Sequence, residues 1–490
     1  MLRSALLAAF LVAAGASALA QEAGVDVDFT LRPTEAQSGD LLDVFPGELE
    51  DGEEPEQRPP ASPPLAGPTG YEVIGPPLAG PTGDEVIGAP LAGPRQAAPL
   101  GREAPPLRPR REAEAEPFAA TGVALGSFVI RPAIEIGVNA TDNPAGAEGE
   151  TAIGFLVAPE FVARSEDSDH EIEVALRGQG IFYSQEEFDE REGEARVRGR
   201  YDLTSRTSLE GEAAYTYSLD RFNDPDTPDA AAERPAVESV EAEIGGTHRF
   251  GRLGVGVTGA VDRTVNEDVA LAGGDIASRQ ELDNTEYEAR VRASYEASGA
   301  MTPYAEVEVG RRNYDLEVDD NGFRRASVWG ELRGGLLVNL GSKLDGEVVV
   351  GYRHEDIEDE RLDDIDAVVA AASVMWSPRR LTEVRVELST DVRPTSVSDS
   401  SGSLVYSATV TALRRVSPRL GLEAGLGFDH ERFVGIDRRE NTFSGFAGVA
   451  YALSRSASLE ARYVHERSAG TEPDDDSKAN AVTVRIRLQR

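Results

Sequence analysis

Three histidines occur in one repeated pattern, with an aromatic residue two positions before the histidine and a glutamate directly after it. The three copies are Tyr352-x-His354-Glu355, Phe428-x-His430-Glu431 and Tyr463-x-His465-Glu466. Imidazole and carboxylate are normal zinc ligands, so one hypothesis is a metal site at the rim of the fold. The alternative is a repeated hairpin that sets an aromatic and then polar residues at a membrane boundary. We favour the second, because the histidines belong to different hairpins and need not converge.

Other candidates for catalysis or ion binding are weaker. The chain shows no Ser-His-Asp order, no metal-spaced His-x-x-x-His and no phosphate loop. The acidic stretch at residues 355–364 could hold Ca²⁺ or Mg²⁺ through oxygens, but it lacks the spacing of a calcium loop, and such a run is more often a solvated surface. The sequence therefore predicts no enzyme, no cofactor and no metal site, although a barrel could still assemble a hydrolase site from distant strands.

Rows of charged residues alternate with apolar residues along many short segments. Around residue 290, for example, Glu288, Arg290 and Arg292 alternate with Tyr287, Ala289 and Val291. Successive side chains of a strand point to opposite faces, so each segment has one apolar and one charged face, and neighbouring rows of opposite sign can pair. The charged rows supply the candidate pore-lining residues, which are Arg196, Arg198, Arg200, Glu210, Glu212, Arg290, Arg292, Glu306, Glu308, Glu383, Arg385, Glu387, Arg485 and Arg487.

The composition and the first residues limit the class of protein. The chain has 490 residues, a net charge of -38 and no cysteine, and this acidic balance argues against nucleic acid as a partner. Residues 1–20 combine an early arginine, a short apolar run and the small residues Ala18 and Ala20, which predicts a secretory signal peptide. No later run of apolar residues is long enough for a membrane helix, so any membrane crossing must use strands.

Residues 21–120 differ from everything after them, because they hold most of the chain's 29 prolines. They contain a tandem 13-residue repeat at residues 63–75 and 76–88, with a partial copy at residues 89–94. A stretch this rich in Pro, Gly and Glu buries too little apolar surface to offset its ordering entropy, so we predict a disordered, acidic periplasmic arm. The repeated Glu-Val-Ile-Gly could be a docking motif, but a duplicated linker is the favoured interpretation.

From residue 121 to residue 490 the alternation hardly stops. Short polar breaks fall near residues 167, 205, 251, 299, 342, 378, 418 and 455, and longer polar loops lie between them. Short turns on one side and long acidic loops on the other are typical of outer-membrane barrels. We therefore predict an all-β, transmembrane, antiparallel up-and-down β-barrel of about 18 strands, within a range of 16–20. A large soluble sandwich or solenoid is the alternative, but the export signal and the shortage of bulky core residues oppose it.

The beginning of this segment carries a resemblance to a known family. Residues 126–132 read Gly-Ser-Phe-Val-Ile-Arg-Pro, followed by Ile136-Gly137, Asp142-Asn143 and a second strand with Pro159. This pattern and the repeated hairpins of about forty residues resemble the outer-membrane β-barrel porin family of proteobacteria, common in alphaproteobacteria. The resemblance implies an outer-membrane barrel, with some relatives associated with exopolysaccharide export. One departure is the end at Arg490, since such barrels usually finish on an aromatic residue read by the assembly machinery.

Three functions compete on this basis. The favoured one is a water-filled pore for solutes or exported polysaccharide in the outer membrane of a Gram-negative bacterium. The others are a non-conducting structural or adhesive barrel and a barrel-embedded hydrolase. Expected partners are outer-membrane lipid and lipopolysaccharide, the barrel assembly machinery and envelope polysaccharide-export components, with no nucleic acid. Opposite rows should largely cancel in the lumen, so the acidic loops should give a modest cation preference set at the mouth.

Overall fold

A computed structural model describes residue 118 and residues 120–144, 150–165, 170–222, 224–228, 231–471 and 476–490 of the chain. The predicted signal peptide, nearly all of the predicted arm and its 13-residue repeat lie outside the described residues. The strands lie between Val123 and Gln489.

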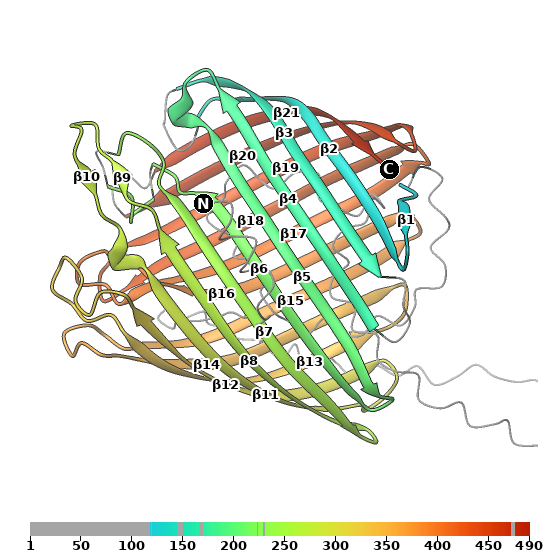
Figure 1. The fold of residues 1–490 in the computed structure, drawn as a ribbon, viewed down its shortest axis with the longest axis horizontal. Helices are drawn as coiled ribbons and strands as arrows, with labels where there is room; N and C mark the ends of the chain where they lie inside the picture. The colour runs from blue at the N-terminus through green and yellow to red at the C-terminus, as the bar shows by residue number, and fades with distance from the viewer. Residues whose placement is uncertain are drawn as a thin grey trace, which may run out of the picture. The chain divides into compact units, whose positions relative to one another are not determined.

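The described chain forms a closed antiparallel β-barrel of eighteen long strands, as predicted (Figure 1). The strands are β2 (Phe128–Thr141), β3 (Ala152–Ser165), β4 (His170–Tyr183), β5 (Glu190–Thr204), β6 (Thr207–Leu219), β7 (Ala236–Phe250), β8 (Leu253–Asn266), β11 (Asn284–Tyr295), β12 (Met301–Tyr314), β13 (Ser327–Asn339), β14 (Leu344–Ile357), β15 (Ile365–Arg379), β16 (Thr382–Arg393), β17 (Gly402–Ser417), β18 (Leu420–Val434), β19 (Arg439–Ser454), β20 (Ala457–Gly470) and β21 (Ser477–Gln489). Each long strand pairs with its neighbours in sequence, and β21 returns to pair with β2. This topology is the up-and-down barrel.

A few short elements lie outside the eighteen long strands. The short strand β1 (Val123–Leu125) pairs with β2, and β9 (Val269–Ala270) pairs with β10 (Ile276–Ala277) inside one loop. Of two single-turn 3₁₀ helices, η2 (Glu186–Phe188) lies in the β4–β5 loop, and η3 (Gln280–Leu282) follows β10 in the same loop. Neither of these described helices is long and apolar enough to cross a membrane.

The turns fall where the sequence predicts them, with two loops missed and one boundary wrong. Short connections join the strands at all eight predicted breaks, while residues 315–326 and 435–438 form two further loops on the opposite end. The predicted acidic loop at residues 355–364 begins too early, because β14 continues to Ile357. Glu355 continues the inward row of Arg353 and is fully buried, so it belongs to the wall. The run of acidic residues resembles a loop, and it obscured the alternation of inward and outward residues that continues to the end of β14.

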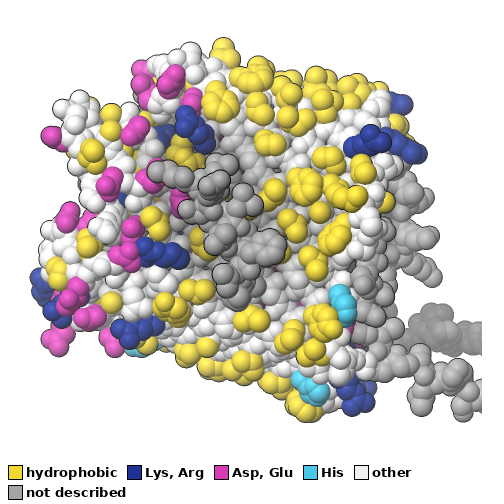
Figure 2. Space-filling model, viewed as in Figure 1, with side chains coloured by type: hydrophobic (Ala, Val, Ile, Leu, Met, Phe, Trp, Pro, Cys, Tyr) yellow, Lys and Arg dark blue, Asp and Glu magenta, His cyan; other side chains and the backbone are white. Residues whose placement is uncertain are grey.

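The two faces of the wall are those that the alternation predicts. On β11, Tyr287 and Val291 are 55% and 51% exposed, whereas Glu288 and Arg290 between them are 7% and 9% exposed. Figure 2 shows hydrophobic side chains spread over the outside of the strands, with Asp and Glu gathered over the loops at the left. An apolar outer band and a charged inner face are what a barrel in lipid requires.

The pairing of β2 with β21 that closes the barrel leaves little room at Gly137. A Cβ built there would lie 2.8 Å from Arg485 Cα and would clash with the carbonyl of Val484. We expect Gly137→Val to overpack this pairing and lower the stability of the barrel by about 1–3 kcal/mol. The measurement is the temperature at which the folded form converts to the slower, unfolded band on a gel. Gly330→Val on the outer face of β13, where nothing lies within 4 Å, is the matched control and should leave that temperature unchanged. Equal midpoints would contradict a tight closure.

Candidate functional site: the lumen and its mouth

All fourteen candidate pore-lining residues lie on the inner face of the barrel. They occupy alternate positions of β5, β6, β11, β12, β16 and β21. The outward positions beside them hold residues such as Val197, Val307, Val386 and Ile486. Their function as a pore lining stays a prediction, but the structure brings most of them into three networks of ion pairs.

The first network covers the wall of β11–β14. Arg290 pairs with Glu308 at 3.1 Å, and Arg292 and Arg333 each pair with Glu306 at 2.6 Å. The network continues through side chains that sequence reasoning did not select, because Arg312 contacts Glu286 at 2.7 Å and Arg353 contacts Glu355 at 2.6 Å. Buried charges are tolerated when each has partners of opposite sign, so these pairs depend on one another.

The second network crosses the pairing of β2 with β21, where the barrel closes. Arg485 pairs with Glu135 at 2.7 Å and with Glu460 at 3.0 Å, while Arg487 reaches Glu160 at 2.6 Å. These residues come from β2, β3, β20 and β21, so the first and last strands share their charges. A break of the closure would leave several charges unpaired at once.

The third network joins β5 to β6. Arg196 and Arg198 both pair with Glu212, at 3.1 Å and 2.7 Å, and Arg200 lies 4.0 Å from Glu210. On β16, Arg385 lies 3.4 Å from Glu383, and Glu387 is exposed on the inner face. The predicted pairing of neighbouring rows is therefore present, most directly between β5 and β6.

Inward aromatic rings hold several arginines in place through one repeated arrangement. Trp329, Tyr304 and Phe446 each lie over the glycine directly opposite on a neighbouring strand, so closely that a Cβ there would clash with the ring. The glycines are Gly310, Gly335 and Gly425, and the arginines on the other ring faces are Arg353, Arg292 and Arg462, at 3.9, 4.1 and 4.0 Å from the ring centroids. Each arginine comes from the strand on the side away from the glycine, so the stack ties three strands together. Cation–π stacking keeps the guanidinium groups flat against the wall.

Acids dominate the buried part of the inner face, which differs from the expected cancellation. Among the described strand residues that are buried there, glutamates outnumber arginines by more than two to one. Two like-charged pairs lie directly opposite each other, Glu212 with Glu243 and Glu241 with Asp262. Like charges directly opposite destabilise a sheet, so this acidic section of β6–β8 costs stability that some other role must justify.

Two loops meet over the mouth of the barrel from nearly opposite walls. Asp226 lies in the β6–β7 loop and accepts hydrogen bonds through Oδ1 from Ser396 N at 2.7 Å, Ser396 Oγ at 2.9 Å and Thr395 Oγ1 at 2.9 Å. Ser396 belongs to the β16–β17 loop, and six strands separate the two hairpins on one side and eight on the other. Arg221 of the first loop also reaches Glu466 on β20 at 2.7 Å. We call the contact between Asp226, Thr395 and Ser396 the mouth bridge.

Arg325 fixes the partner loop of the mouth bridge. It lies in the β12–β13 loop that sequence reasoning missed, and its guanidinium donates to the carbonyls of Ser400 and, at 3.0 Å, Val397. Asp319 accepts from Arg325 Nε at 2.6 Å and holds the group in place. The loop at residues 394–401 is therefore tied to two other loops.

A comparison with protein families identifies the chain. The family described as "Putative beta-barrel porin 2" matches residues 116–490, which include every strand of the barrel. The chain belongs to this family. No curated protein matches it.

Solved structures with a similar arrangement of strands are distant. The siderophore receptor PirA from Pseudomonas aeruginosa is 8% identical with a TM-score of 0.35, over 74% of this chain and 80% of that one. PirA from Acinetobacter baumannii is 6% identical with a TM-score of 0.38, over 74% and 80% of the two chains. The ferric enterobactin receptor PfeA from Pseudomonas aeruginosa, with enterobactin, is 6% identical with a TM-score of 0.39, over 76% and 82%. These likenesses are too distant to bear on function.

The three repeated histidines of this porin-family chain lie on the outer face and do not converge. Each forms a 2.9 Å hydrogen bond with the residue directly opposite on the next strand: His354 with Asp366, His430 with Asn441 and His465 with Asn480. Within the residues that the structure describes, no group of His, Cys, Asp and Glu is placed to hold a metal ion. The placement of this pattern at a membrane boundary stays a prediction.

The mouth bridge predicts a response to pH. Burial raises the pKa of Asp226 above its usual value, despite the hydrogen bonds from Ser396 and Thr395 and the nearby charge of Arg279, which favour the ionised form. A carboxyl whose pKa is raised in the bridged state binds its proton more tightly there, so acid favours the bridge and rising pH weakens it. We expect conductance across a lipid bilayer to fall on acidification, through closure of the mouth.

Two substitutions of Asp226 separate the charge from the contact. Asp226→Asn keeps a neutral acceptor, so its conductance should stay low and independent of pH. Asp226→Ala removes three hydrogen bonds and should shift the mouth toward the open state by roughly 1–3 kcal/mol at every pH. Single-channel recordings of the two variants and the unaltered chain make the comparison. An Asp226→Asn channel that still responds to pH like the unaltered chain would sink this explanation.

Proposed function

We propose that this protein is a pore for small hydrophilic solutes in the outer membrane of a Gram-negative bacterium. The observation that carries the proposal is the charged inner face of a closed barrel with eighteen long strands. Barrels of this size leave an aqueous channel unless something fills them. Family membership and the apolar outer band support the same proposal. Lipid, lipopolysaccharide and the barrel assembly machinery are its expected partners.

The acidic lumen favours cations over anions. The opposed Glu241 and Asp262 have no arginine within ion-pair distance among the described residues, and two buried carboxyls this close share a proton, so the pair places about one negative charge beside permeating ions. An acidic wall repels acidic polymers, and the mouth bridge narrows the way out, so small neutral or cationic solutes fit this lumen better than an exported acidic polysaccharide.

A non-conducting structural barrel is the second candidate, and one observation favours it. The mouth bridge joins opposite walls, and a bridge that never opens would close the channel. A barrel-embedded hydrolase has no comparable support. Current through the Asp226→Ala variant distinguishes the first two candidates, because a structural barrel should stay silent even without the bridge.

Ion selectivity tests the pore. We expect a cation preference with two parts. One part comes from exposed loop acids and weakens as salt shortens the Debye length from about 10 Å at 0.1 M to about 3 Å at 1 M. The other comes from Glu241 and Asp262 inside the wall and persists at high salt. The measurement is the reversal potential across a bilayer with unequal salt on its two sides.

Two matched variants show which residues produce each part of the cation preference. The loop variant changes Glu358→Gln, Glu360→Gln and Asp363→Asn, all exposed residues, and should lower the preference only at low salt. The lumen variant changes Glu241→Gln and Asp262→Asn and should lower the cation preference at both low and high salt. Anion selectivity of the unaltered chain would contradict the acidic-lumen account. Absence of current from both the unaltered chain and Asp226→Ala would contradict the pore.

A further inference from the structure

The wall of the barrel is split between β15 and β16 near its loop end. The pairing of these two strands runs from the turn only as far as Ala372 opposite Leu388. By contrast, β15 stays paired with β14 up to Ile365 opposite Glu355, and β16 stays paired with β17 up to Arg393 opposite Ser403. Both strands are therefore regular on their other sides, and the loss of pairing is confined to the line between them. We call this line the seam.

One side chain replaces the missing ladder at the lower end of the seam. Thr390 Oγ1 accepts from Ala370 N at 3.1 Å and donates to Ala370 O at 3.0 Å. The seam extends from there to Asp366, which lies opposite His354 on β14, a length of roughly 13–14 Å along the strand. Backbone groups without partners cost several kcal/mol each in hydrocarbon, so a split at this depth is an expensive feature.

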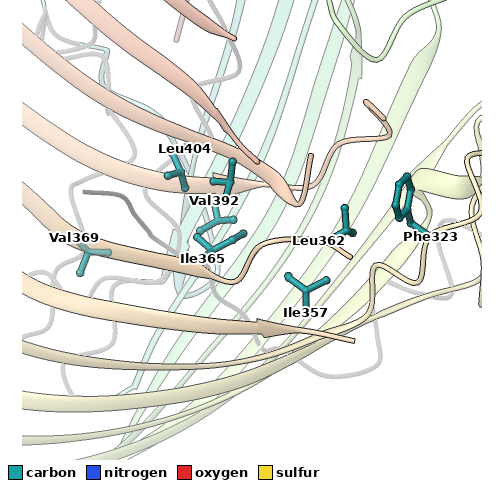
Figure 3. Packing of buried hydrophobic residues seen from close by; sticks show 8 residues of the cluster. Phe323, Ile357, Leu362, Ile365, Val369, Val392 and Leu404 are labelled. Carbon is teal, nitrogen blue, oxygen red and sulfur yellow. The ribbon is translucent and has the colours of Figure 1, made fainter. Parts of the chain in front are cut away.

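The upper part of the β16–β17 hairpin lies on the inner side of β15. Val392 and Leu404 occupy outward positions by alternation, as Leu388 does, yet they are 6% and 0% exposed while Leu388 is 40% exposed. They belong to one apolar cluster with Ile365 and Val369, which are inward residues of β15, and Figure 3 shows Val392 and Leu404 beside Ile365. The hairpin has therefore moved behind its neighbour, and apolar side chains seal the seam from within.

An apolar track leads along the inner wall to the seam. The inner face of β15 carries no charged residue and presents Ile365, Ala367, Val369 and Ala371 in a row. Ala371 packs against Val349 and Tyr304 lower in the lumen, and Val369 and Ile365 belong to the cluster behind the seam. A lumen that carries only hydrophilic solutes gains nothing from such a track, because these solutes bind neither to it nor through it.

We propose that the seam is a lateral passage for the acyl chain of a single-chain amphiphile between the lumen and the outer leaflet of the membrane. The track solvates the chain, while the charged networks beside it leave a hydrated path for the polar head. The seal consists of side-chain contacts and the Thr390 hydrogen bonds, so it opens without breaking a strand ladder. The proposal rests on the proposed pore, because it uses the same lumen.

The absence of cysteine from the chain allows a direct lock. Ala370→Cys with Thr390→Cys places a disulfide across the seam, where the two residues already touch. Val410→Cys with Leu426→Cys joins two directly opposite outward residues of the paired strands β17 and β18 and serves as the matched control. A difference in gel migration between unheated and boiled samples checks that each variant folds. Ion conductance across a bilayer checks that the pore is open.

The probe is a long-chain alkyl phosphate with a photoreactive group near the end of its chain, dissolved in the bilayer of proteoliposomes that hold the full chain. Because the probe starts in lipid, the seam is its direct route to the inward residues Ile365 and Val369, and entry by the mouth would give labelling that the seam disulfide does not change. We expect labelling at Ile365 and Val369 themselves, assigned residue by residue, to fall by about tenfold when the seam disulfide forms, to return on reduction, and to be unaffected by the control disulfide. Every form should still conduct ions, which shows that the disulfide blocks the seam and not the lumen.

A second variant tests the track and leaves the outer face of the wall and the Thr390 hydrogen bonds unchanged. Val369→Glu should abolish labelling at Ile365, while the outward Val368 stays labelled as in the unaltered chain. Equal labelling of locked and reduced protein, or labelling of Ile365 that survives Val369→Glu, would overturn the passage. Loss of ion conductance from the unaltered chain would instead count against the pore itself, so the two failures are distinguishable.

Discussion

Every backbone amide in a membrane wall must find its partner inside the wall, because hydrocarbon offers none. Closure by β2 and β21 meets this requirement around the eighteen long strands except along the seam between β15 and β16, and it fixes the rest of the structure. Once the sheet is closed, each strand must turn alternate residues to lipid and to the lumen. The charged rows are then confined to a curved inner surface, where they must pair with one another or face water. The three ion-pair networks are consequences of closure as much as of composition.

The inner surface also shows how a wall can carry many arginines and stay thin. An arginine that projects freely would fill the lumen, whereas Arg292, Arg353 and Arg462 lie flat on aromatic rings. The rings can lie flat only because the residue opposite each is a glycine, which leaves room on the neighbouring strand. Small, aromatic and cationic residues on three successive strands thus form one unit. A side chain at the glycine would push the ring and its arginine toward the lumen, and loss of the ring would free the arginine.

The strands, the eight short turns and the face of each charged row follow from the sequence, because they depend on period-2 alternation within one segment. Features that depend on residues far apart in the chain cannot be predicted in this way. Asp226 and Ser396 are 170 positions apart in ordinary polar loops, and nothing near either residue indicates the other. The glycine, aromatic and arginine stacks need the register of three strands. Glu355 was misplaced because a run of acids resembles a loop, although its inward row with Arg353 could have shown the strand.

The mouth bridge and the seam are parts of one distortion. The loop at residues 394–401 is the tip of the β16–β17 hairpin, and it reaches toward Asp226 only because the hairpin leans into the barrel. A hairpin that leans inward must separate from the strand beside it, and β15 is that strand. The lost ladder is thus offset by the hydrogen bonds of Asp226 and Arg325 and by the apolar contacts of Val392 and Leu404. Because the same hairpin makes both contacts, release of the tip from Asp226 removes part of what holds the hairpin behind β15, so the state of the mouth and the state of the wall are energetically coupled.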